Sequence, residues 1–338
     1  MYDVIIIGAG PAGCRTAELL AKSKKKVLVI EEHTKIGEPV QCTGLISGKL
    51  LEIHPDLPKN IILNKIKTAR FFAPSGTNFS LSVKKPALVV DRAKLDKWIY
   101  SKAKQAGAEF KLGMQFKGFQ KKSNNLIIKT NNGNFETHIL IGADGPLSRV
   151  RKLAKIKADY TQQIFSQKTI VFGGAKRGRL LQGHRPGEGK FGDSADLCFG
   201  GEYFNWFVPI SKTKARFGGP SKEMKFKGES GGVCRYGLLK TAQKGNIYLV
   251  GDAALQVKPF SCGGVVYGQI AARCLAKAII EDRDYDELWK AKLAWPIRKG
   301  LLLCQFYTFP NWLKSLLFEI IVRTCSEKLL ENLDMDFY

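Results

Sequence analysis

Short apolar runs on either side of an amphipathic stretch open the chain. Val4–Ile7 is apolar throughout and predicts a buried strand. The stretch Cys14–Lys22 places Ala17 and Leu20 on one face and predicts a helix. Val27–Ile30 then predicts a second buried strand. A strand, a helix and a strand within about 30 residues predict a βαβ unit at the start of the chain.

The rest of the chain alternates between the strand and helix periods, which predicts a mixed α/β (α+β) fold. At 338 residues, the length suggests about two domains. Further strands are predicted at Ile66–Ala73, Asn78–Val83, Gln115–Gln120, Leu126–Thr130, Phe135–His138, Ile139–Gly142 and Ile247–Val250, with a strand-rich aromatic region from Thr161 to Pro220. Further helices are predicted at Arg92–Ala106, from Gly263-Gly264 to about Ile280, at Tyr285–Lys299 and at Trp312–Thr324.

A glycine-rich turn joins the first strand to the first helix. Gly8, Gly10 and Gly13 form the pattern GxGxxG, and Glu31 closes the second strand. The first glycine allows a tight turn, the second lets a pyrophosphate approach the backbone, and the third lets the helix pack on the strand. The helix N-terminus then offers N–H groups to phosphate, and the acid offers an acceptor to a ribose. This arrangement predicts a dinucleotide site.

A second GxGxxG pattern, from Gly187 to Gly192, lacks this context. It follows His184-Arg185-Pro186, with no strand before it, and no helical pattern comes after it. We therefore interpret it as a loop.

Two later glycine–acid signatures complete an ordered set. Gly142-Ala143-Asp144-Gly145 runs into Ser148, Val150 and Arg151, and Gly251-Asp252-Ala253 follows a late strand. With the first turn, they resemble the FAD-containing flavoproteins of the para-hydroxybenzoate hydroxylase fold group. The alternative interpretation is that the two acids only cap helices.

Three further segments resemble the geranylgeranyl reductase family within that group. Gly37–Gly44 is similar to its P-x-x-C-x-G loop, and Phe204–Pro209 to its Y-x-W-x-F-P motif. Val257–Val265 is similar to its K-P-x-[ST]-G-G-G-[IV] loop. Several positions depart from the family pattern. Phe204 stands for Tyr and Val208 for Phe, Gly218-Gly219-Pro220 lacks the second spaced glycine, and Leu255 and Cys262 replace glycines.

The resemblance implies an FAD-binding Rossmann-like βαβ domain, an interleaved antiparallel β-sheet substrate domain and a C-terminal helical segment. We place the FAD-binding domain at 1–65, 87–155 and 240–284, the substrate domain at 66–86 and 156–239, and the helical segment at 285–338. The implied FAD contacts come from Gly8, Gly10, Ala12, Gly13, Glu31, Glu32, Cys42, Thr43, Arg92, Phe116, Asp144, Gly145, Gly251, Asp252, Gly263, Gly264 and Val265.

The same resemblance implies substrate contacts from Phe204, Trp206 and Pro209. Cys42 is the candidate proton donor because of its position in the loop beside the flavin. For Arg92, a salt bridge with Asp96 one helical turn later is the alternative to a place beside the FAD diphosphate. No Cys/His cluster has zinc spacing, so we expect no metal site.

The implied activity is reduction of C=C bonds in an isoprenoid (geranylgeranyl) chain, in archaeal-type membrane lipid biosynthesis. An NAD(P)H-dependent aromatic-ring hydroxylase of the same fold is one alternative. An FAD-dependent RNA-modification enzyme or nucleic-acid-binding flavoprotein is another.

The chain is strongly basic, with 54 Lys and Arg against 30 Asp and Glu, a formal charge of +24. These residues are spread along the sequence, which argues against a dedicated nucleic-acid site. The candidate partners are an isoprenoid lipid, a reductant that is NAD(P)H or ferredoxin, and an anionic membrane surface. Eight cysteines without CxxC and the lack of a signal peptide predict a cytoplasmic protein. The apolar face of 312–322 favours a peripheral place at the inner face of the membrane, with packing on the protein's own core as the alternative.

Overall fold

The computed structural model describes residues 1–171, 192–224 and 228–324, without the side chains of 83–84. Contacts divide the chain into two compact units. Unit 1 comprises Met1–Pro39, Arg92–Gln162 and Val233–Leu301. Unit 2 comprises Val40–Asp91, Gln163–Gly232 and Leu302–Tyr338.

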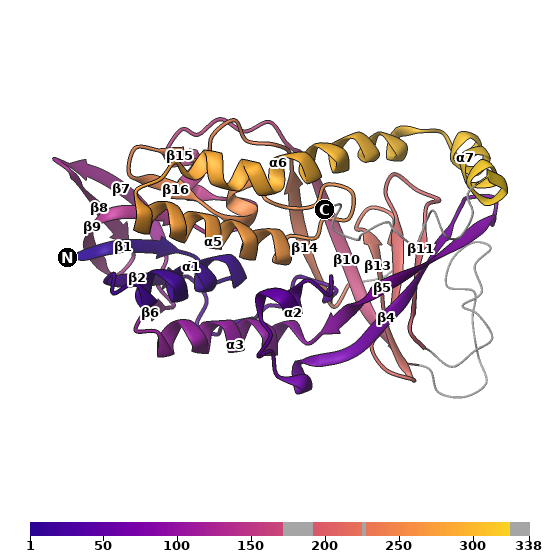
Figure 1. Cartoon of the computed structure of the whole chain (residues 1–338), viewed down its shortest axis with the longest axis horizontal. Coiled ribbons are helices and arrows are strands. Elements are labelled where there is room, and N and C mark those ends of the chain that lie inside the picture. Colours follow the sequence, from indigo (N-terminus) through magenta and orange to yellow (C-terminus); the bar gives the residue numbers. More distant parts are fainter. Residues whose placement is uncertain (172–191, 225–227, 325–338) are drawn as a thin grey trace. The chain divides into compact units, whose positions relative to one another are not determined.

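Unit 1 is built on a mainly parallel sheet with the strand order β15-β16-β9-β1-β2-β6 (Figure 1). The strands β16, β9, β1, β2 and β6 run parallel to one another. Antiparallel pairing adds β15 beside β16, β8 beside β9, and β7 beside β8. The bounds are β1 (Tyr2–Ile7), β2 (Val27–Glu31), β6 (Glu109–Leu112), β7 (Phe116–Lys122), β8 (Asn125–Thr130), β9 (Gly133–Gly142), β15 (Gln243–Lys244) and β16 (Ile247–Leu249). The central strands are apolar because both faces of a parallel sheet are covered.

Helices flank this sheet (Figure 1). The first, α1, packs against α3 and α5. It begins at Pro11, three residues before the predicted start, because proline is favoured in the first helical turn, where its missing N–H costs nothing. The bounds are α1 (Pro11–Lys22), α3 (Arg92–Gln105), α4 (Arg149–Leu153), the 3₁₀ turn η2 (Gly251–Ala254), α5 (Val265–Glu281) and α6 (Tyr285–Cys304), whose last residues belong to unit 2.

Unit 2 holds the second sheet, with the order β14-β10-β13-β12-β11-β4-β5-β3. The pairs β10–β13, β13–β12, β12–β11, β4–β5 and β5–β3 are antiparallel, whereas β4 and β11 are parallel. The bounds are β3 (Leu45–Ile46), β4 (Ile62–Phe72), β5 (Asn78–Val90), β10 (Thr161–Val171), β11 (Ser194–Cys198), β12 (Asn205–Pro209), β13 (Lys214–Pro220) and β14 (Ser230–Tyr236), with α2 (Leu50–Ile53), η1 (Lys59–Ile61), η3 (Gln305–Thr308) and α7 (Asn311–Thr324).

Strand β5 runs to Val90, seven residues beyond its predicted end at Val83. The register between β4 and β5 shifts between Ile66 and Thr68, opposite the part of β5 that contains Pro86. Such a bulge accommodates a residue without an N–H, so the strand continues past the proline.

The predicted α/β (α+β) class is confirmed, whereas the domain boundaries are drawn differently by the contacts. Residues 40–65, which we assigned to the FAD-binding domain, group with unit 2. There β3 pairs with β5, and β4 begins at Ile62. The second GxGxxG pattern falls almost entirely on 187–191, outside the described residues. No helix within the described ranges is long and apolar enough to cross a membrane.

Candidate functional site

The predicted cofactor residues of unit 1 gather at one edge of its sheet. Gly8 follows β1, Glu31 ends β2, Asp144 follows β9, and Asp252 follows β16. These strands are parallel, so their carboxyl ends share an edge, and ligands of open α/β sheets bind at that edge. Residues far apart in the sequence therefore lie at one crevice.

The glycine turn after β1 allows backbones to approach closely. Gly8 has φ +103°, and a Cβ there would overlap the carbonyl oxygen of Ala143. A Cβ at Gly13 would overlap the carbonyl oxygen of Gly8. Neither position tolerates a side chain, so the two glycines serve the packing of α1 and the β9 loop on β1.

Gly10 differs from its two neighbours in the pattern. A Cβ there would meet no atom within 4 Å, so the space above it is open. Gly10 is the N-cap of α1 and Pro11 the first helical residue, and no side chain caps this end. The helix therefore directs N–H groups and the positive end of its dipole into open space, which suits a phosphate.

Glu31 links the second strand to the glycine turn. Its Oε2 accepts a hydrogen bond of 2.7 Å from the Ala9 N–H, and its Oε1 accepts one of 2.9 Å from the His33 N–H. A carboxylate has about four acceptor positions, so Glu31 keeps capacity for a ribose hydroxyl. The neighbouring Glu32 is exposed.

The segment before β7 passes beside the end of β2. The Met114 N–H donates to the Glu31 carbonyl oxygen at 2.9 Å. Phe116, predicted to contact the adenine, begins β7 two residues later and is buried. Phe116 is thus two residues along the chain from Met114, which is hydrogen-bonded to Glu31, the candidate acceptor for the ribose.

Asp144 has a capping role, as the alternative interpretation proposed. Its carboxylate accepts from the Ser148 hydroxyl at 2.6 Å and from the N–H groups of Arg149 and Val150 at 2.7 and 3.0 Å. These bonds fix the start of α4. Gly145, with φ +74° and no atom within 4 Å of a Cβ, leaves its side of the loop open.

Asp252 is the least satisfied acid of the crevice. Within the described part of the chain, its carboxylate accepts no hydrogen bond. Its Oδ1 lies where a Cβ of Gly264, the N-cap of α5, would stand. Burial raises the pKa of Asp252 to about 6, although the charge of Arg92 acts in the opposite direction. A partly desolvated carboxylate without donors is suited to the hydroxyl groups of a bound ligand.

Arg92 forms the salt bridge that was the alternative interpretation from the sequence, and its place beside the FAD diphosphate stays a prediction. Its Nε and Nη2 donate to the two carboxylate oxygens of Asp96 at 3.2 and 3.1 Å, the salt bridge expected one turn along α3. Its charge also acts on Asp252. The ion pair orients the guanidinium.

The late loop is packed against the first turn of α1. A Cβ at Gly251 would come within 2.8 Å of the Ala12 Cβ, and one at Gly268 within 3.2 Å of it. The buried Gln269 donates to the Pro11 carbonyl oxygen at 2.7 Å. Gly263, Gly264 and Val265 follow at the start of α5.

In unit 2, Cys42 and Thr43 lie in a loop held by the sheet. The Cys42 sulfur accepts from the Gly44 N–H at 3.3 Å, and the Thr43 hydroxyl donates to Gln167 Oε1 at 2.8 Å. The Thr43 carbonyl oxygen accepts from Arg216. Sequence patterns had not indicated Gln167 or Arg216, since each is one polar residue in an ordinary strand.

The predicted substrate residues lie on β12 and just before it. Trp206 packs over Gly218, where a Cβ would come within 2.5 Å of its ring. Its indole nitrogen is buried and has no hydrogen-bond partner among the described residues. Phe204 is buried among aromatic rings. Pro209 ends the strand, and its carbonyl oxygen accepts from the Asn64 amide at 3.0 Å.

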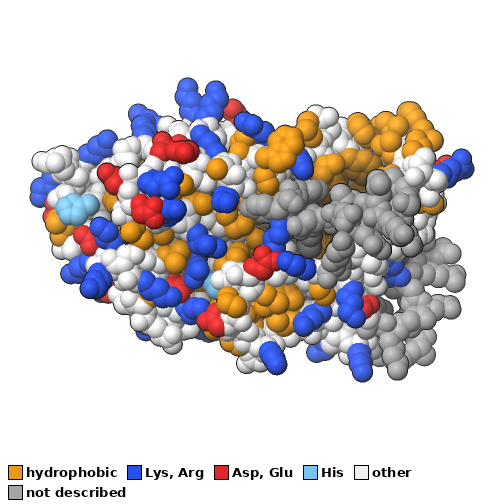
Figure 2. All heavy atoms as spheres, in the orientation of Figure 1, with side chains coloured by type: hydrophobic (Ala, Val, Ile, Leu, Met, Phe, Trp, Pro, Cys, Tyr) orange, Lys and Arg blue, Asp and Glu red, His pale blue; other side chains and the backbone are white. Residues whose placement is uncertain are grey.

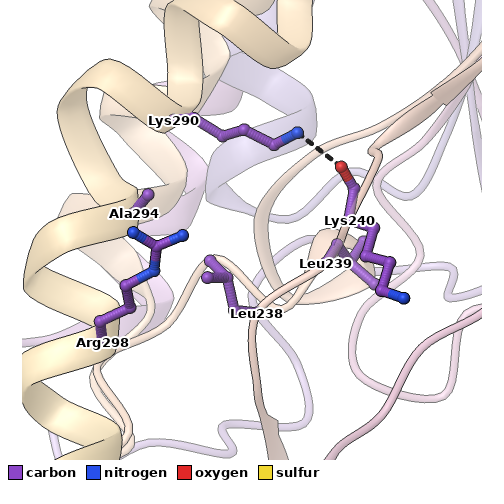
Figure 3. A pocket seen from close by; sticks show the side chains of 6 residues that line it. All are labelled: Leu238, Leu239, Lys240, Lys290, Ala294 and Arg298. Atoms are coloured by element: carbon purple, nitrogen blue, oxygen red, sulfur yellow. Dashed lines mark hydrogen bonds between the residues drawn. The ribbon is translucent and has the colours of Figure 1, made fainter.

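A separate cavity of about 250 Å³ lies between α6 and the segment before β15 (Figure 3). Three basic residues line it together with three apolar ones: Lys240, Lys290, Arg298, Leu238, Leu239 and Ala294. Lys290 reaches across to donate to the Lys240 carbonyl oxygen. The cavity is smaller than a typical ligand pocket of about 300–1,000 Å³, and no residue predicted from the sequence lines it.

Comparisons with known proteins cover nearly the whole chain. The model of an NAD(P)-binding Rossmann-like domain matches residues 6–42. A digeranylgeranylglycerophospholipid reductase of Methanosphaera stadtmanae is 28% identical, over 84% of this chain and 79% of the relative. One of Methanocaldococcus jannaschii is 27% identical, over 86% and 83%. A geranylgeranyl bacteriochlorophyll reductase-like protein of Thermoplasma acidophilum has the same fold, with a TM-score of 0.78, 20% identity and coverage of 97% and 94%.

The predicted resemblance to the geranylgeranyl reductase family is confirmed. The comparisons also confirm that the cofactor is FAD and that the chain is an FAD-dependent oxidoreductase. The residue-by-residue contacts of this geranylgeranyl reductase-like chain remain predictions.

The crevice of unit 1 fits FAD. The open, uncapped end of α1 at Gly10 suits the diphosphate, and Glu31 suits the ribose of the AMP half. Asp252 lacks the donors that the ribityl hydroxyls of FAD would provide. These residues would hold the cofactor along the carboxyl edge of the sheet.

Replacing Gly10 with alanine tests the phosphate cradle. The φ of −70° suits alanine and the space is open, so the unfolding free energy should be unchanged or rise by up to about 1 kcal/mol. The methyl group would occupy the space of the diphosphate, so the Kd for FAD, measured by fluorescence titration, should rise at least about tenfold. Gly200→Ala, at an equally open position in unit 2, is the matched control. Equal FAD affinities of the two variants would contradict the assignment.

Asp252→Asn tests the unsatisfied carboxylate. The pKa of Asp252 is higher in the folded FAD-free protein than in the unfolded chain, so its contribution to stability is present at low pH. That contribution is lost between about pH 4 and 6. The FAD-free variant should therefore be more stable than the wild type at pH 7.5, by up to about 3 kcal/mol, and similar to it near pH 4. Urea unfolding at both pH values measures this difference.

The control for this comparison is Asp193→Asn, which makes the same substitution at a half-exposed carboxylate of unit 2. The Asp252→Asn protein should also bind FAD more weakly, since an amide is a poorer acceptor than a carboxylate. A variant that gains nothing at pH 7.5 would show that the carboxylate is satisfied in solution.

Proposed function

We propose that this chain reduces the C=C bonds of a geranylgeranyl chain carried by a membrane lipid, in archaeal-type lipid biosynthesis. The names of its relatives, digeranylgeranylglycerophospholipid reductases that match along most of their length, support this substrate class. Aromatic-ring hydroxylation is the rival that the fold leaves open.

One observation in unit 2 carries the proposal. Gln167, which accepts a hydrogen bond from the Thr43 hydroxyl, lies on one face of this sheet. The same face carries a continuous series of aromatic rings. Gln167 and Trp206 both pair with Gly218 in neighbouring strands, so their side chains lie on one face. From Trp206 the rings follow one another at centroid distances of 5.0–6.4 Å, through Phe165, Tyr203, Phe204, Tyr307, Phe199, Phe71, Phe79 and Phe318.

This aromatic series suits a long apolar chain better than a flat polar ring. Phe199 and Tyr203 are fully buried and form its foundation, whereas Phe165 and Trp206, next to the Cys42 loop, are partly exposed. Aromatic faces also favour a nearby positive charge. An isolated C=C bond has no carbonyl to stabilise negative charge, so its reduction requires carbocation-like character, which a dry aromatic surface favours.

Bound FAD, in its reduced form, supplies the hydride for this reaction. The protein must provide a proton to the second carbon, so that each double bond gains two hydrogens. We assign this proton to the Cys42 thiol, whose sulfur is held by the Gly44 N–H. The thiol would recover its proton from water between turnovers.

The basic surface fits an anionic electron donor, and we propose NAD(P)H or ferredoxin in this role. Figure 2 shows Lys and Arg side chains scattered over the visible face, without one basic stripe. That distribution suits transient docking of an acidic partner and gives no support for a nucleic-acid groove.

A reduction assay tests the substrate. Chemically reduced, FAD-loaded protein should convert a lipid with geranylgeranyl chains into products heavier by two hydrogens per reduced bond, as measured by mass spectrometry. Cys42→Ala should slow this reaction by at least about tenfold while it binds FAD normally. An unchanged lipid, together with peroxide release from NADH and O₂ when phenols are added, would favour the hydroxylase.

We further propose that α7 brings this active site to the membrane surface. Trp312, Leu316 and Ile320 recur every four residues and are 68%, 45% and 46% exposed. The opposite side of α7 is docked on unit 2 through Phe318, packed on Phe79, and through the buried Lys314. Hydrophobic side chains gather at the place that Figure 1 labels α7 (Figure 2). An apolar stripe on a basic protein suits an anionic bilayer.

The double variant Leu316→Glu, Ile320→Glu tests this surface. Its binding to vesicles of equal parts phosphatidylglycerol and phosphatidylcholine, measured by sedimentation, should fall at least about tenfold because charged side chains cannot enter the acyl region. Leu63→Glu, Ile164→Glu is the matched control, since it makes the same charge change at exposed apolar positions of other elements in unit 2. If both variants lose binding equally, charge alone holds the protein on the vesicle and α7 has no special role.

A further inference from the structure

The loop 41–44 is held on the sheet of unit 2 mainly through Thr43 and Gly44. The Gln41 carbonyl oxygen lies within 3.0 Å of where a Cβ of Gly232 on β14 would stand. The Cys42 sulfur accepts from the Gly44 N–H, and the Gly44 carbonyl oxygen accepts from the Val90 N–H at 2.8 Å. A four-residue loop held this closely is constrained in a way that connecting loops usually are not.

Arg216 on β13 is the main support of this loop. Its Nη1 donates to the carbonyl oxygen of Thr43 and, at 3.4 Å, to that of Val90. One planar guanidinium thus joins the loop to the end of β5. The two segments lie next to the points, Pro39–Val40 and Asp91–Arg92, where the chain passes between units.

Gln167 on β10 provides the second support. Its Oε1 accepts from the Thr43 hydroxyl at 2.8 Å, and its Nε2 donates to the Ser230 hydroxyl at 3.0 Å. Gln167 is buried, so both ends of its amide are used and its orientation is set by two partners. Thr43 is therefore held by its carbonyl oxygen from one strand and by its hydroxyl from another.

Gly44 leaves room for this arrangement. It has φ +80°, and a Cβ there would overlap the Val90 carbonyl oxygen and approach Arg216 Nη1 at 2.7 Å. The glycine thus permits the guanidinium to reach the loop backbone.

We propose that Arg216 and Gln167 are positioning residues that hold the Cys42–Thr43 loop, and with it the Cys42 thiol, in its reactive geometry. Neither residue touches the reacting atoms. Proton delivery depends on placing the donor to within a fraction of an ångström, so a loose loop would slow the chemical step more than it would weaken binding. The proposal rests on the proposed function for the reaction that Cys42 serves, and on the contacts above for the loop.

The first test measures the thiol itself, in protein loaded with FAD. The rate at which iodoacetamide alkylates Cys42 is followed by peptide mass spectrometry, with Cys274 in unit 1 as the internal reference. Arg216→Met and Thr43→Val should each raise the Cys42 rate at least about fivefold, because the loop is released. Thr43→Ser, which keeps the hydroxyl, should behave as the wild type.

Arg216→Lys should resemble Arg216→Met, because the lysine ammonium ends one bond short of the place of Nη1, the nitrogen that reaches both carbonyl oxygens. Lys214→Met, at an exposed position of the same strand, is the matched control and should leave the rate unchanged. Melting curves identify variants that fail to fold, and if Arg216→Met is one of them, the Thr43 pair decides.

The second test measures turnover of the geranylgeranyl lipid. Arg216→Met and Thr43→Val should each lower kcat at least about tenfold, and Arg216→Met should leave KM and the visible spectrum of the bound flavin close to those of the wild type. A Cys42 alkylation rate within about twofold of the wild type in both variants would overturn the proposal, as would faster alkylation with unchanged kcat. If no lipid is reduced, the proposed function fails, whereas the alkylation result still decides whether Arg216 and Gln167 hold the loop.

Discussion

The structure of unit 1 depends on a close approach of three backbones at the carboxyl ends of β1 and β9. Gly13 on α1 lies against the Gly8 carbonyl oxygen, and Gly8 lies against the Ala143 carbonyl oxygen, with no room for a Cβ at either glycine. This contact lets the open end of α1 at Gly10 face the same crevice as the later loops. The crevice therefore follows from backbone packing before any ligand is present.

Much of this arrangement could be predicted from the sequence, because it depends on local patterns. The apolar runs of β1, β2 and β9 identify a parallel sheet, and the glycine–acid signatures that follow strands must meet at its edge. Backbone conformation also bears on two of the departures from the family pattern. Leu255 and Cys262 stand where the family has glycine, and both have positive φ, +55° and +53°. The left-handed conformation is retained at a cost of about 1 kcal/mol for each residue.

The parts that could not be predicted depend on contacts across long separations. Arg216 lies 173 residues from Thr43, and Gln167 lies 124 residues from it. Each is a single polar side chain on a strand, and only the register between β10, β13 and β12 brings it to the loop face. The extension of β5 past Pro86 was missed for a similar reason, since the bulge that accommodates it is set by the partner strand.

The two acids of the crevice show why a signature alone does not define a role. Asp144 and Asp252 both follow a strand and both sit beside glycine, yet Asp144 has its donors close by in the chain, from Ser148 and Arg149. Asp252 has no such donor in the described chain, and its neighbours are the apolar surroundings that raise its pKa and the distant charge of Arg92. A buried acceptor without donors is destabilising by about 1–3 kcal/mol in the free protein. A bound molecule whose hydroxyl groups donate to Asp252 removes that cost. Satisfying this carboxylate therefore contributes to the free energy of ligand binding.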